Sequence, residues 1–284
     1  PRRLTANDSV FDYPQMKNGL KQRIRDENAL RNLQSEAIAA RQSKIPDRIH
    51  NVFMKISTIA YGMSPQEREG FLMRYGCSAW TEEILSFIVD SSKDRGIVEI
   101  GAGNGQWARA IYDRSKKKDL NDSQITKTMK DYDDFILAYD SMQELPLSPK
   151  VYHSHTQPAH DFFYSKVQTC SSHVEAARRM SSRGRVLLLV YPPPGPMAVE
   201  TIQAYVDVYP QGNDTVIYVG EGRGGANGDD ELFNYFCNSG EWILTKVMDV
   251  QKSIKGYERC FCFQRINHKE LQLSVENPDI VNKS

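Results

Sequence analysis

Short apolar runs recur along the chain from residue 97 onward. Each run is rich in aliphatic and β-branched residues, and polar positions hardly interrupt it. Runs of this kind are typical of parallel strands that are covered on both faces of a sheet. We therefore predict strands at IVEI (97–100), FILAY (135–139), RVLLLVY (185–191) and TVIYVG (215–220).

Stretches with helical spacing separate these strands. An earlier helix is expected after Thr81, because a threonine can cap a helix and the next two residues are acidic. Since strands and helices alternate, the pattern indicates a doubly wound, Rossmann-like α/β sheet. The helices predicted between the strands are Gly105–Arg114, Ser172–Met180, Met197–Val208 and Asp230–Cys237.

Two strand-like runs follow the last predicted helix. They read WILTKVMDV and YERCFCFQR, and a polar turn around Lys255 and Gly256 joins them. A short connection of this kind links antiparallel strands, whereas parallel strands need a longer crossover. The sheet is therefore expected to end in a C-terminal antiparallel hairpin.

The first 60 residues have a different pattern. Apolar residues recur at near-helical spacing from Leu20 to Ile38, and no strand pattern occurs. We therefore divide the chain into an N-terminal helical arm (1–60), an α/β domain (61–268) and a C-terminal tail (269–284). The arm has a modest excess of arginine, so it either covers one edge of the core or faces RNA.

Composition narrows the choice of partners. The chain carries 36 basic and 36 acidic residues, so a nucleic acid must be held by a local patch and not by a global field. The longest apolar run, Val186 to Tyr191, is far shorter than the roughly 20 residues that span a bilayer. No secretory signal opens the sequence. We expect an intracellular protein, nuclear or cytoplasmic, with no membrane partner.

The cysteines and the charged insertion have simple interpretations. Five cysteines occur without a CxxC pair, which argues against a disulfide framework and against a metal site. Cys260 and Cys262 are interpreted as small buried apolar residues. The lysine-rich segment 114–131 is interpreted as a solvated loop, with contact to phosphates as the alternative.

A glycine-rich turn joins the first of these strands to a helix. In open α/β sheets, nucleotide-like ligands bind at this position. A dinucleotide fingerprint needs the spacing G-x-G-x-x-G, whereas the glycines of VEIGAGNGQW are Gly101, Gly103 and Gly105. The pattern E-x-G-x-G-x-G, which starts at Glu99, instead resembles motif I of class I S-adenosylmethionine-dependent methyltransferases.

That resemblance implies a cofactor and a set of residues. In the family, the glycine turn lies against the amino acid part of S-adenosylmethionine, and the acid at the strand end helps hold its ammonium group. The α/β domain would then be a class I methyltransferase catalytic domain. The implied cofactor-binding residues are Glu99, Gly101, Ala102, Gly103, Asn104, Gly105 and Asp140.

The position of Asp140 in the sequence also indicates a role in ligand binding. It ends the second predicted strand, where a carboxylate can accept hydrogen bonds from both ribose hydroxyls of a nucleoside. Such acids occur in dinucleotide-binding proteins too, and a cap on the following turn is the structural alternative. The histidine-containing segment 152–158 falls where a loop would lie at the edge of the adenine. The alternative is an ordinary loop without a ligand.

Three prolines follow the fourth predicted strand. Pro192, Pro193 and Pro194 fix their own φ angles and have no backbone N–H, so they can neither extend the sheet nor start a helix at once. Together with Tyr191 and Gly195 they form a stiff segment, called here the proline ledge. Because it leaves the carboxyl edge of the sheet, it should face the same crevice as the glycine turn.

The proline ledge resembles the (Asp/Asn)-Pro-Pro-aromatic motif of adenine N6-methyltransferases. In them the first side chain and a proline carbonyl accept hydrogen bonds from the target amine, and the aromatic ring stacks on the base. Here Tyr191 occupies the first position and Pro194 the aromatic position. Over 74–265 the order of motifs is most similar to cap-adjacent adenosine methyltransferases, including the kinetoplastid type.

The segment GEGRGGANGDD (220–230) adds two candidates. Its glycines and asparagines let the backbone approach a ligand closely. Glu221 can accept a hydrogen bond from an amine or a sugar, and Arg223 can meet a phosphate. A flexible turn without a ligand is the alternative, and Asp229 or Asp230 is expected to cap the next helix.

The sequence thus predicts an S-adenosylmethionine-dependent N6-methyltransferase that acts on a 5′-proximal adenosine of RNA, at or next to an mRNA cap. The predicted acceptor-side residues are Tyr191, Pro192, Pro193, Pro194 and Glu221, with Arg223 and Tyr191 binding substrate. Two alternatives stay open. One is a methyltransferase for a small-molecule or protein amine, and the other is a non-catalytic module that binds nucleotides or RNA, with or without a protein partner.

Overall fold

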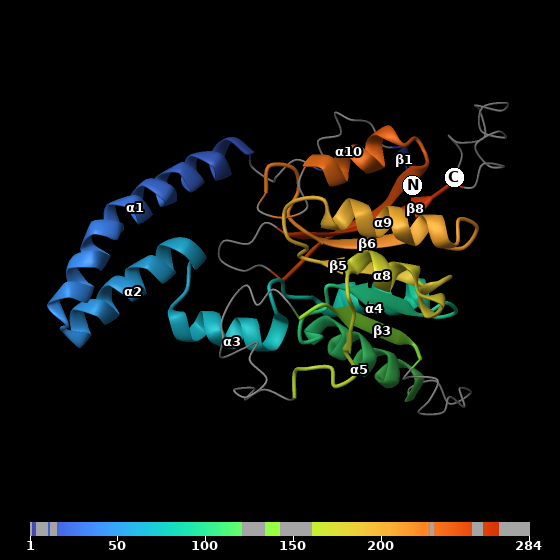
Figure 1. The fold of residues 1–284 in the computed structure, drawn as a ribbon, viewed down its shortest axis with the longest axis horizontal. Coiled ribbons are helices and arrows are strands. Elements are labelled where there is room, and N and C mark those ends of the chain that lie inside the picture. The colour runs from blue at the N-terminus through green and yellow to red at the C-terminus, as the bar shows by residue number, and fades with distance from the viewer. Residues whose placement is uncertain are drawn as a thin grey trace.

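The computed structural model describes most of the chain, and the described strands form one extended sheet. Helices cover both faces of the sheet, and helices α1 and α2 stand apart from it (Figure 1). The described residues are 2–3, 11, 16–120, 134–142, 161–225, 227, 230–251 and 258–266. The predicted tail at 269–284 therefore lies outside them, as do most of the charged insertion and the segment 152–158.

The strands follow the predicted runs closely and add two short ones. Within the described residues the sheet has eight strands in the order β1-β7-β8-β6-β5-β2-β3-β4. The strands are β1 (Arg2–Arg3), β2 (Ile97–Ile100), β3 (Ile136–Asp140), β4 (Gln168–Thr169), β5 (Val186–Val190), β6 (Thr215–Gly220), β7 (Trp242–Asp249) and β8 (Arg259–Arg265).

The strand order creates a switch point beside β2. The chain runs from β2 outward to β3 and β4, and then returns to β5 on the other side of β2. Strands β2 to β6 run parallel to one another. Strand β8 pairs antiparallel with β6, and β7 pairs antiparallel with β8. The predicted doubly wound α/β fold with a C-terminal antiparallel hairpin is thus confirmed. In such sheets ligands bind outside the carboxyl ends of the strands at the switch point.

Helices alternate with the strands as the periodicity predicts. Helix α9 occupies the predicted range, and Thr81 caps α4 by accepting a hydrogen bond from the Ile84 N–H at 3.2 Å. The helices are α1 (Met16–Ser43), α2 (Pro46–Tyr61), α3 (Pro65–Tyr75), α4 (Glu82–Ser92), α5 (Gln106–Leu120), α8 (His173–Arg178), α9 (Met197–Val208) and α10 (Asp230–Asn238), with a 3-10 turn at Met180–Ser182.

Two apolar cores lie on the two faces of the sheet. Alternate residues of each central strand point to opposite faces, so Leu187 and Leu189 of β5 enter one core and Val186 and Leu188 the other. Helices α8, α9 and α10 cover the first core, and α4 and α5 cover the second. Cys260 and Cys262 are buried in the second core, as predicted, and all five cysteines are free.

The N-terminal helices form a pair that projects from the sheet. Helix α1 packs along α2, and α2 leads into α3, which packs against α5 (Figure 1). Among the described side chains of α1, those from residue 25 to 43, Ala40 is the only buried apolar one, whereas Ile38 is 58% exposed. From residue 25 to residue 43, this helix therefore does not cover an edge of the core. The division of the chain at residues 60 and 268 stays a prediction.

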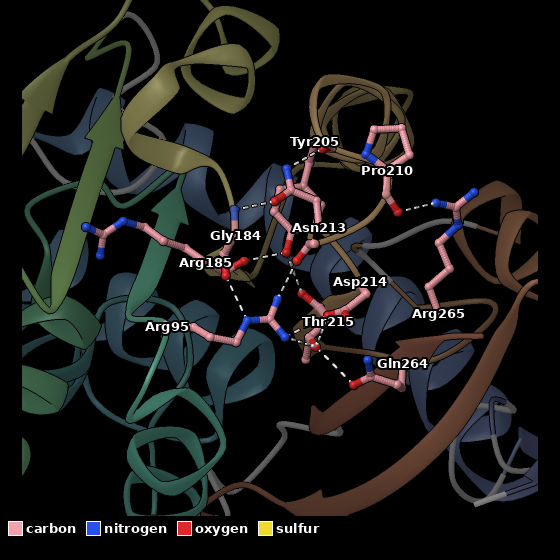
Figure 2. Close-up of polar contacts among 11 residues, drawn as sticks. Arg95, Gly184, Arg185, Tyr205, Pro210, Asn213, Asp214, Thr215, Gln264 and Arg265 are labelled. Atoms are coloured by element: carbon pink, nitrogen blue, oxygen red, sulfur yellow. Dashed lines mark hydrogen bonds and ion pairs between the residues drawn. The ribbon is translucent and has the colours of Figure 1, made fainter. Parts of the chain in front are cut away.

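A network around Arg95 holds the amino ends of three parallel strands together (Figure 2). Its guanidinium donates to the carbonyls of Gly184 and Gly212 and to Asp214 Oδ1, each at 2.7 Å. Arg95 precedes β2, Gly184 precedes β5 and Asp214 precedes β6. The network thus fixes the strands at the edge opposite the predicted crevice.

Replacing Arg95 by alanine should lower the free energy of unfolding by about 2–3 kcal/mol, because two backbone carbonyls lose their guanidinium donor and the Asp214 carboxylate loses its ion pair and keeps only the Thr215 hydroxyl. As a control, Lys55→Ala removes an exposed ion pair with Glu36 and should cost under about 0.5 kcal/mol. Urea unfolding of both variants measures the difference. Equal losses for the two variants would show that the Arg95 network does not hold the strands.

Candidate functional site

A cavity of about 640 Å³ opens at the carboxyl ends of β2, β3 and β5. Its size is typical of a small-molecule site. The glycine turn, Asp140 and the proline ledge meet there, which places the predicted crevice at the switch point. The lining residues are Tyr75, Gly76, Cys77, Glu99, Gly101, Ala102, Gly103, Gln106, Trp107, Asp140, Ser141, Met142, Ser171, Ser172, His173, Val190, Tyr191, Pro193, Pro194 and Met197.

The glycine turn is held from the neighbouring strand. The amides of Gly101 and Ala102 both donate to the carbonyl of Tyr139 in β3, at 2.9 and 3.0 Å. The next amide, that of Gly103, donates to Asp140 Oδ2 at 2.7 Å. These bonds turn the chain from β2 into α5 and leave the turn facing the cavity.

Gly105 has a packing role. Its φ is +75°, and a Cβ at this position would lie 2.7 Å from both Tyr164 Cβ and Val167 Cγ2. Only glycine therefore lets the start of α5 pack on the segment 163–167. Gly105 and Asn104 do not line the cavity.

Glu99 brings a carboxyl group to the buried wall of the cavity. The residue is 2% exposed, and its Oε2 has no hydrogen-bond partner among the described residues. Burial raises the pKa of Glu99 to about 8; a hydrogen bond from the Ala108 amide opposes the rise, and the charge of Asp140 adds to it. A buried acceptor without a partner is costly, so this oxygen indicates a ligand that carries a donor or a positive charge.

Asp140 combines the two roles considered for it. Besides accepting from Gly103, it accepts from the Met142 amide through Oδ1 at 2.7 Å, so it caps the turn that follows β3. Each carboxylate oxygen has a second lone pair, and the residue lines the cavity. It can therefore accept hydroxyl donors from a ligand while it holds the glycine turn.

The proline ledge begins at a residue with unusual backbone geometry. Tyr191 has φ +52°, in the left-handed region that residues other than glycine rarely adopt. Its amide donates to the Val219 carbonyl at 2.7 Å, which extends the pairing of β5 with β6 by one residue. Pro193 and Pro194 then line the cavity, whereas Pro192 is buried and does not line it.

Glu221 and Arg223 lie outside the lining residues. Glu221 is 8% exposed, and its amide donates to Asn227 Oδ1 at 2.7 Å, so the start of this segment is anchored. Arg223 is turned to the body of the protein: its amide donates to the Phe11 carbonyl at 2.7 Å, and its guanidinium lies 5.6 Å from the Phe11 ring centre. Contact of Arg223 with a phosphate stays a prediction.

The structure brings most predicted site residues to one cavity. Asn104, Gly105, Pro192, Glu221 and Arg223 do not line it. The predicted residues that do line it are Glu99, Gly101, Ala102, Gly103, Asp140, Tyr191, Pro193 and Pro194. Their roles in binding or catalysis are still predictions, because the placement shows proximity and not chemistry.

Sequence reasoning missed the wall formed by the end of α3. Tyr75 and Cys77 line the cavity, and the Tyr75 ring packs edge-on against Trp80, which packs in the same way against Trp107. The Trp107 indole also donates to the Ser78 carbonyl at 2.8 Å. The only signal was the cluster of aromatic residues around RYGCSAW, which does not by itself indicate a cavity wall.

The part of the lining that comes from the start of α8 was also missed. His173, in the first turn of α8, lines the cavity, and its Nε2 lies 2.9 Å from Glu200 Oε2 of α9. Among the residues that the structure describes, no group of three or more His, Cys, Asp or Glu is placed to hold a metal ion. Within the same residues, no helix is long and apolar enough to cross a membrane.

Comparisons with known proteins give weak likenesses. No family model and no curated protein matches the chain. An rRNA methylase from Streptococcus thermophilus matches with 11% identity and TM-score 0.37, over 65% of this chain and 95% of the other. An O-methyltransferase family protein from Burkholderia thailandensis matches with 11% identity and TM-score 0.37, over 88% and 71%.

A third solved structure, a mutant of MtNAS in complex with S-adenosylmethionine, matches with 11% identity and TM-score 0.36, over 92% of this chain and 87% of the other. Likenesses at this level are too low to carry an argument about function. The strand order and the cavity of the chain itself carry the interpretation.

Gly105→Ala should destabilise the protein by about 3 kcal/mol, from left-handed backbone strain of about 1–2 kcal/mol plus overpacking against Tyr164 and Val167. Gly240→Ala is a matched control, because Gly240 has φ +67° and open space around its Cβ position. The control should lose only about 1–2 kcal/mol. Chemical unfolding compares the two variants, and equal losses would contradict the close packing at Gly105.

The raised pKa of Glu99 makes stability depend on pH. The folded protein keeps this proton up to about pH 8, whereas the unfolded chain releases it near 4.5, so the favourable contribution is complete below 4.5 and is lost as pH rises to 8. Wild type should therefore lose stability relative to Glu99→Gln between about pH 5 and 8. Urea unfolding across this range measures it. Parallel curves for the two proteins would show that Glu99 titrates normally.

Proposed function

We propose that the chain is an S-adenosylmethionine-dependent N-methyltransferase, and that its acceptor is the N6 amine of an adenosine in RNA, at or next to the 5′ cap. One observation carries the proposal. The acid of β2, the glycine turn and Asp140 line the same cavity as Tyr191, Pro193 and Pro194 of the proline ledge. The proposed nucleoside-binding residues and the proposed amine-binding segment thus share one space.

The donor side fits the cofactor chemically. The partnerless oxygen of Glu99 suits an ammonium group, which would compensate the buried carboxylate. Asp140 lines the same cavity from the end of β3, and its remaining lone pairs suit ribose hydroxyls. When bound, S-adenosylmethionine supplies a methyl group on a positively charged sulfur.

The acceptor side needs alignment more than acid or base. Holding an amine in line with the reacting carbon can supply roughly 7–11 kcal/mol of the barrier. The proline ledge is suited to this, because its three prolines fix their φ angles and hold the backbone in one conformation. Carbonyls held in this way can grip amine hydrogens without reorganising as charge develops.

Adenosine in RNA is the finer part of the proposal. The resemblance of the proline ledge to the adenine N6-methyltransferase motif supports it. A base at an RNA end can enter the cavity without extrusion from a duplex, which favours a cap-proximal adenosine. Exposed arginines of α1, among them Arg25, Arg31 and Arg41, offer local positive charge to a chain whose net charge is zero.

The test combines binding with transfer. In isothermal titration, wild type should bind S-adenosylmethionine, and Glu99→Gln should bind it at least about tenfold more weakly, because glutamine, unlike Glu99, cannot release a proton to become the counter-charge of the ammonium group. With labelled cofactor, wild type should methylate capped RNA that starts with adenosine, and digestion should yield N6-methyladenosine. RNA that starts with guanosine should stay unlabelled.

Controls separate the alternatives. Asp113→Asn changes an exposed carboxylate on α5 and should bind and transfer as wild type does. Transfer to small amines or to protein but not to RNA would replace the RNA substrate by those acceptors. Cofactor binding without transfer to any amine would favour a non-catalytic module, and no cofactor binding would overturn the whole proposal.

A further inference from the structure

The proline ledge lacks the aromatic residue that its resemblance implies. Pro194 stands at the aromatic position, and a proline ring has no π-face on which a base can stack. The cavity nevertheless has an aromatic residue on another wall. Tyr75, the last residue of α3, lines the same space as Pro193 and Pro194. The end of α3 therefore brings an aromatic side chain to the cavity that the ledge borders.

Aromatic neighbours hold the Tyr75 ring in place. Its centre lies 4.9 Å from the Trp80 ring centre at an interplanar angle of 71°, and 5.3 Å from the Phe71 ring centre at 50°. Trp80 meets Trp107 at 5.6 Å and 80°. Neither contact of Tyr75 is a parallel stack, so among the described residues no ring lies flat on it. The ring is fixed and still has a face for a ligand.

Two residues at the start of α5 anchor the segment that carries Tyr75. Gln106 Nε2 donates to the Leu72 carbonyl at 3.2 Å, and the Trp107 indole N–H donates to the Ser78 carbonyl at 2.8 Å. These carbonyls lie three residues before and three residues after Tyr75 in the chain. Since α5 begins directly after the glycine turn, the turn and the Tyr75 wall are held together. A surface that is already ordered binds a ligand without the cost of ordering it.

Positive charge lies beside the ring. Arg74 precedes Tyr75 on α3 and is exposed, and its guanidinium carbon lies 5.1 Å from the Tyr75 ring centre. An exposed guanidinium can bind a phosphate next to a base that lies on the ring. A small neutral amine would gain nothing from this charge. An aromatic ring with an arginine beside it is a combination that binds single-stranded nucleic acid, so it favours a nucleotide as the ligand.

We infer that Tyr75 is the residue on which the acceptor base stacks, in place of the aromatic residue that the proline ledge lacks. Tyr75 is then a specificity-determining residue, and this inference rests on the proposed function. Stacking on an aromatic ring strengthens the binding of any base, because every base has a π-face. Tyr75 thus selects a flat base for the cavity, and the choice of adenine falls to other groups.

The test compares two capped RNAs that differ in one base. The first nucleotide carries either adenine or no base at all, so the cap, the sugar and the phosphates are the same in both. Fluorescence anisotropy measures the binding of each RNA, with the demethylated cofactor product S-adenosylhomocysteine present. Wild type should bind the adenosine RNA about tenfold or more tightly than the abasic RNA, because only a base can stack.

Tyr75→Leu should reduce this preference to about threefold or less, because leucine is apolar but has no ring face. Tyr75→Met serves the same purpose if leucine prevents folding. Tyr75→Phe should keep the preference, because the ring remains and only the hydroxyl is lost.

Tyr61→Leu is the matched control. Tyr61 is the last residue of α2, and a glycine with positive φ follows it, as one follows Tyr75. A guanidinium carbon, that of Arg68, also lies near its ring, 4.6 Å from the centre. Tyr61 is 43% exposed and does not line the cavity, so Tyr61→Leu should keep the wild-type preference.

A second measurement reports stacking itself. The fluorescent base 2-aminopurine replaces the first adenine, and stacking on an aromatic ring quenches its emission. Saturating wild type, Tyr75→Phe and Tyr61→Leu should quench the bound RNA equally, whereas Tyr75→Leu should lose about half of the quenching or more. Equal quenching by Tyr75→Leu would show that the base does not lie on this ring.

The outcomes separate this inference from the proposed function. An unchanged preference in Tyr75→Leu, or no preference in wild type, would overturn the role of Tyr75. A preference lost only in Tyr191→Leu would assign the stacking to Tyr191 and also overturn it. Methyl transfer by wild type to the adenosine RNA would still support the proposed function in these cases. A preference that depends on Tyr75, in a protein that transfers no methyl group, would support the inference and overturn the activity.

Discussion

The hydrogen bond from the Tyr191 amide to the Val219 carbonyl determines where the site begins. It is the last ladder donor available on β5, because the three residues that follow are prolines. The bond carries the β5–β6 pairing one residue past the strand, and Tyr191 adopts φ +52° at the point where the chain turns away. Strain of this kind persists only where the surroundings determine it, and it is common at functional sites.

Charge is distributed unevenly around the cavity that results. One buried acid, Glu99, lines the cavity beside the glycine turn, and a second acid, Asp140, lines it from the end of β3. The chain as a whole is neutral, so this is a local arrangement and not a consequence of composition. The buried carboxyl of Glu99 suits a nitrogen that carries a positive charge or a proton.

Much of this fold could be predicted from the chain, and the reasons are local. Buried parallel strands are continuous apolar runs, so β2, β3, β5 and β6 were found within a residue or two. Helix α3 was missed. Its start is a capping box between Ser64 and Glu67, but its apolar residues are few and follow no clear stripe. The two-residue strands β1 and β4 are too short to leave a pattern.

The site was predictable only in part, because long-range register does not show in a local pattern. Tyr75 and Cys77 reach the cavity only through the long-range packing of α3 against α5. Arg223 stands in a glycine-rich segment that suggests an open loop, yet the fold turns it against Phe11 near the other end of the chain. Glu99 and Asp140 were accessible to sequence reasoning because each lies at the end of a strand.

A crystal structure of the protein with S-adenosylmethionine tests the central claim most directly. The account predicts the cofactor in the cavity at the switch point, with its ammonium within hydrogen-bond distance of Glu99 and its methyl group facing the proline ledge. A cofactor bound elsewhere on the sheet, or one whose methyl group faces away from Tyr191, Pro193 and Pro194, would contradict it.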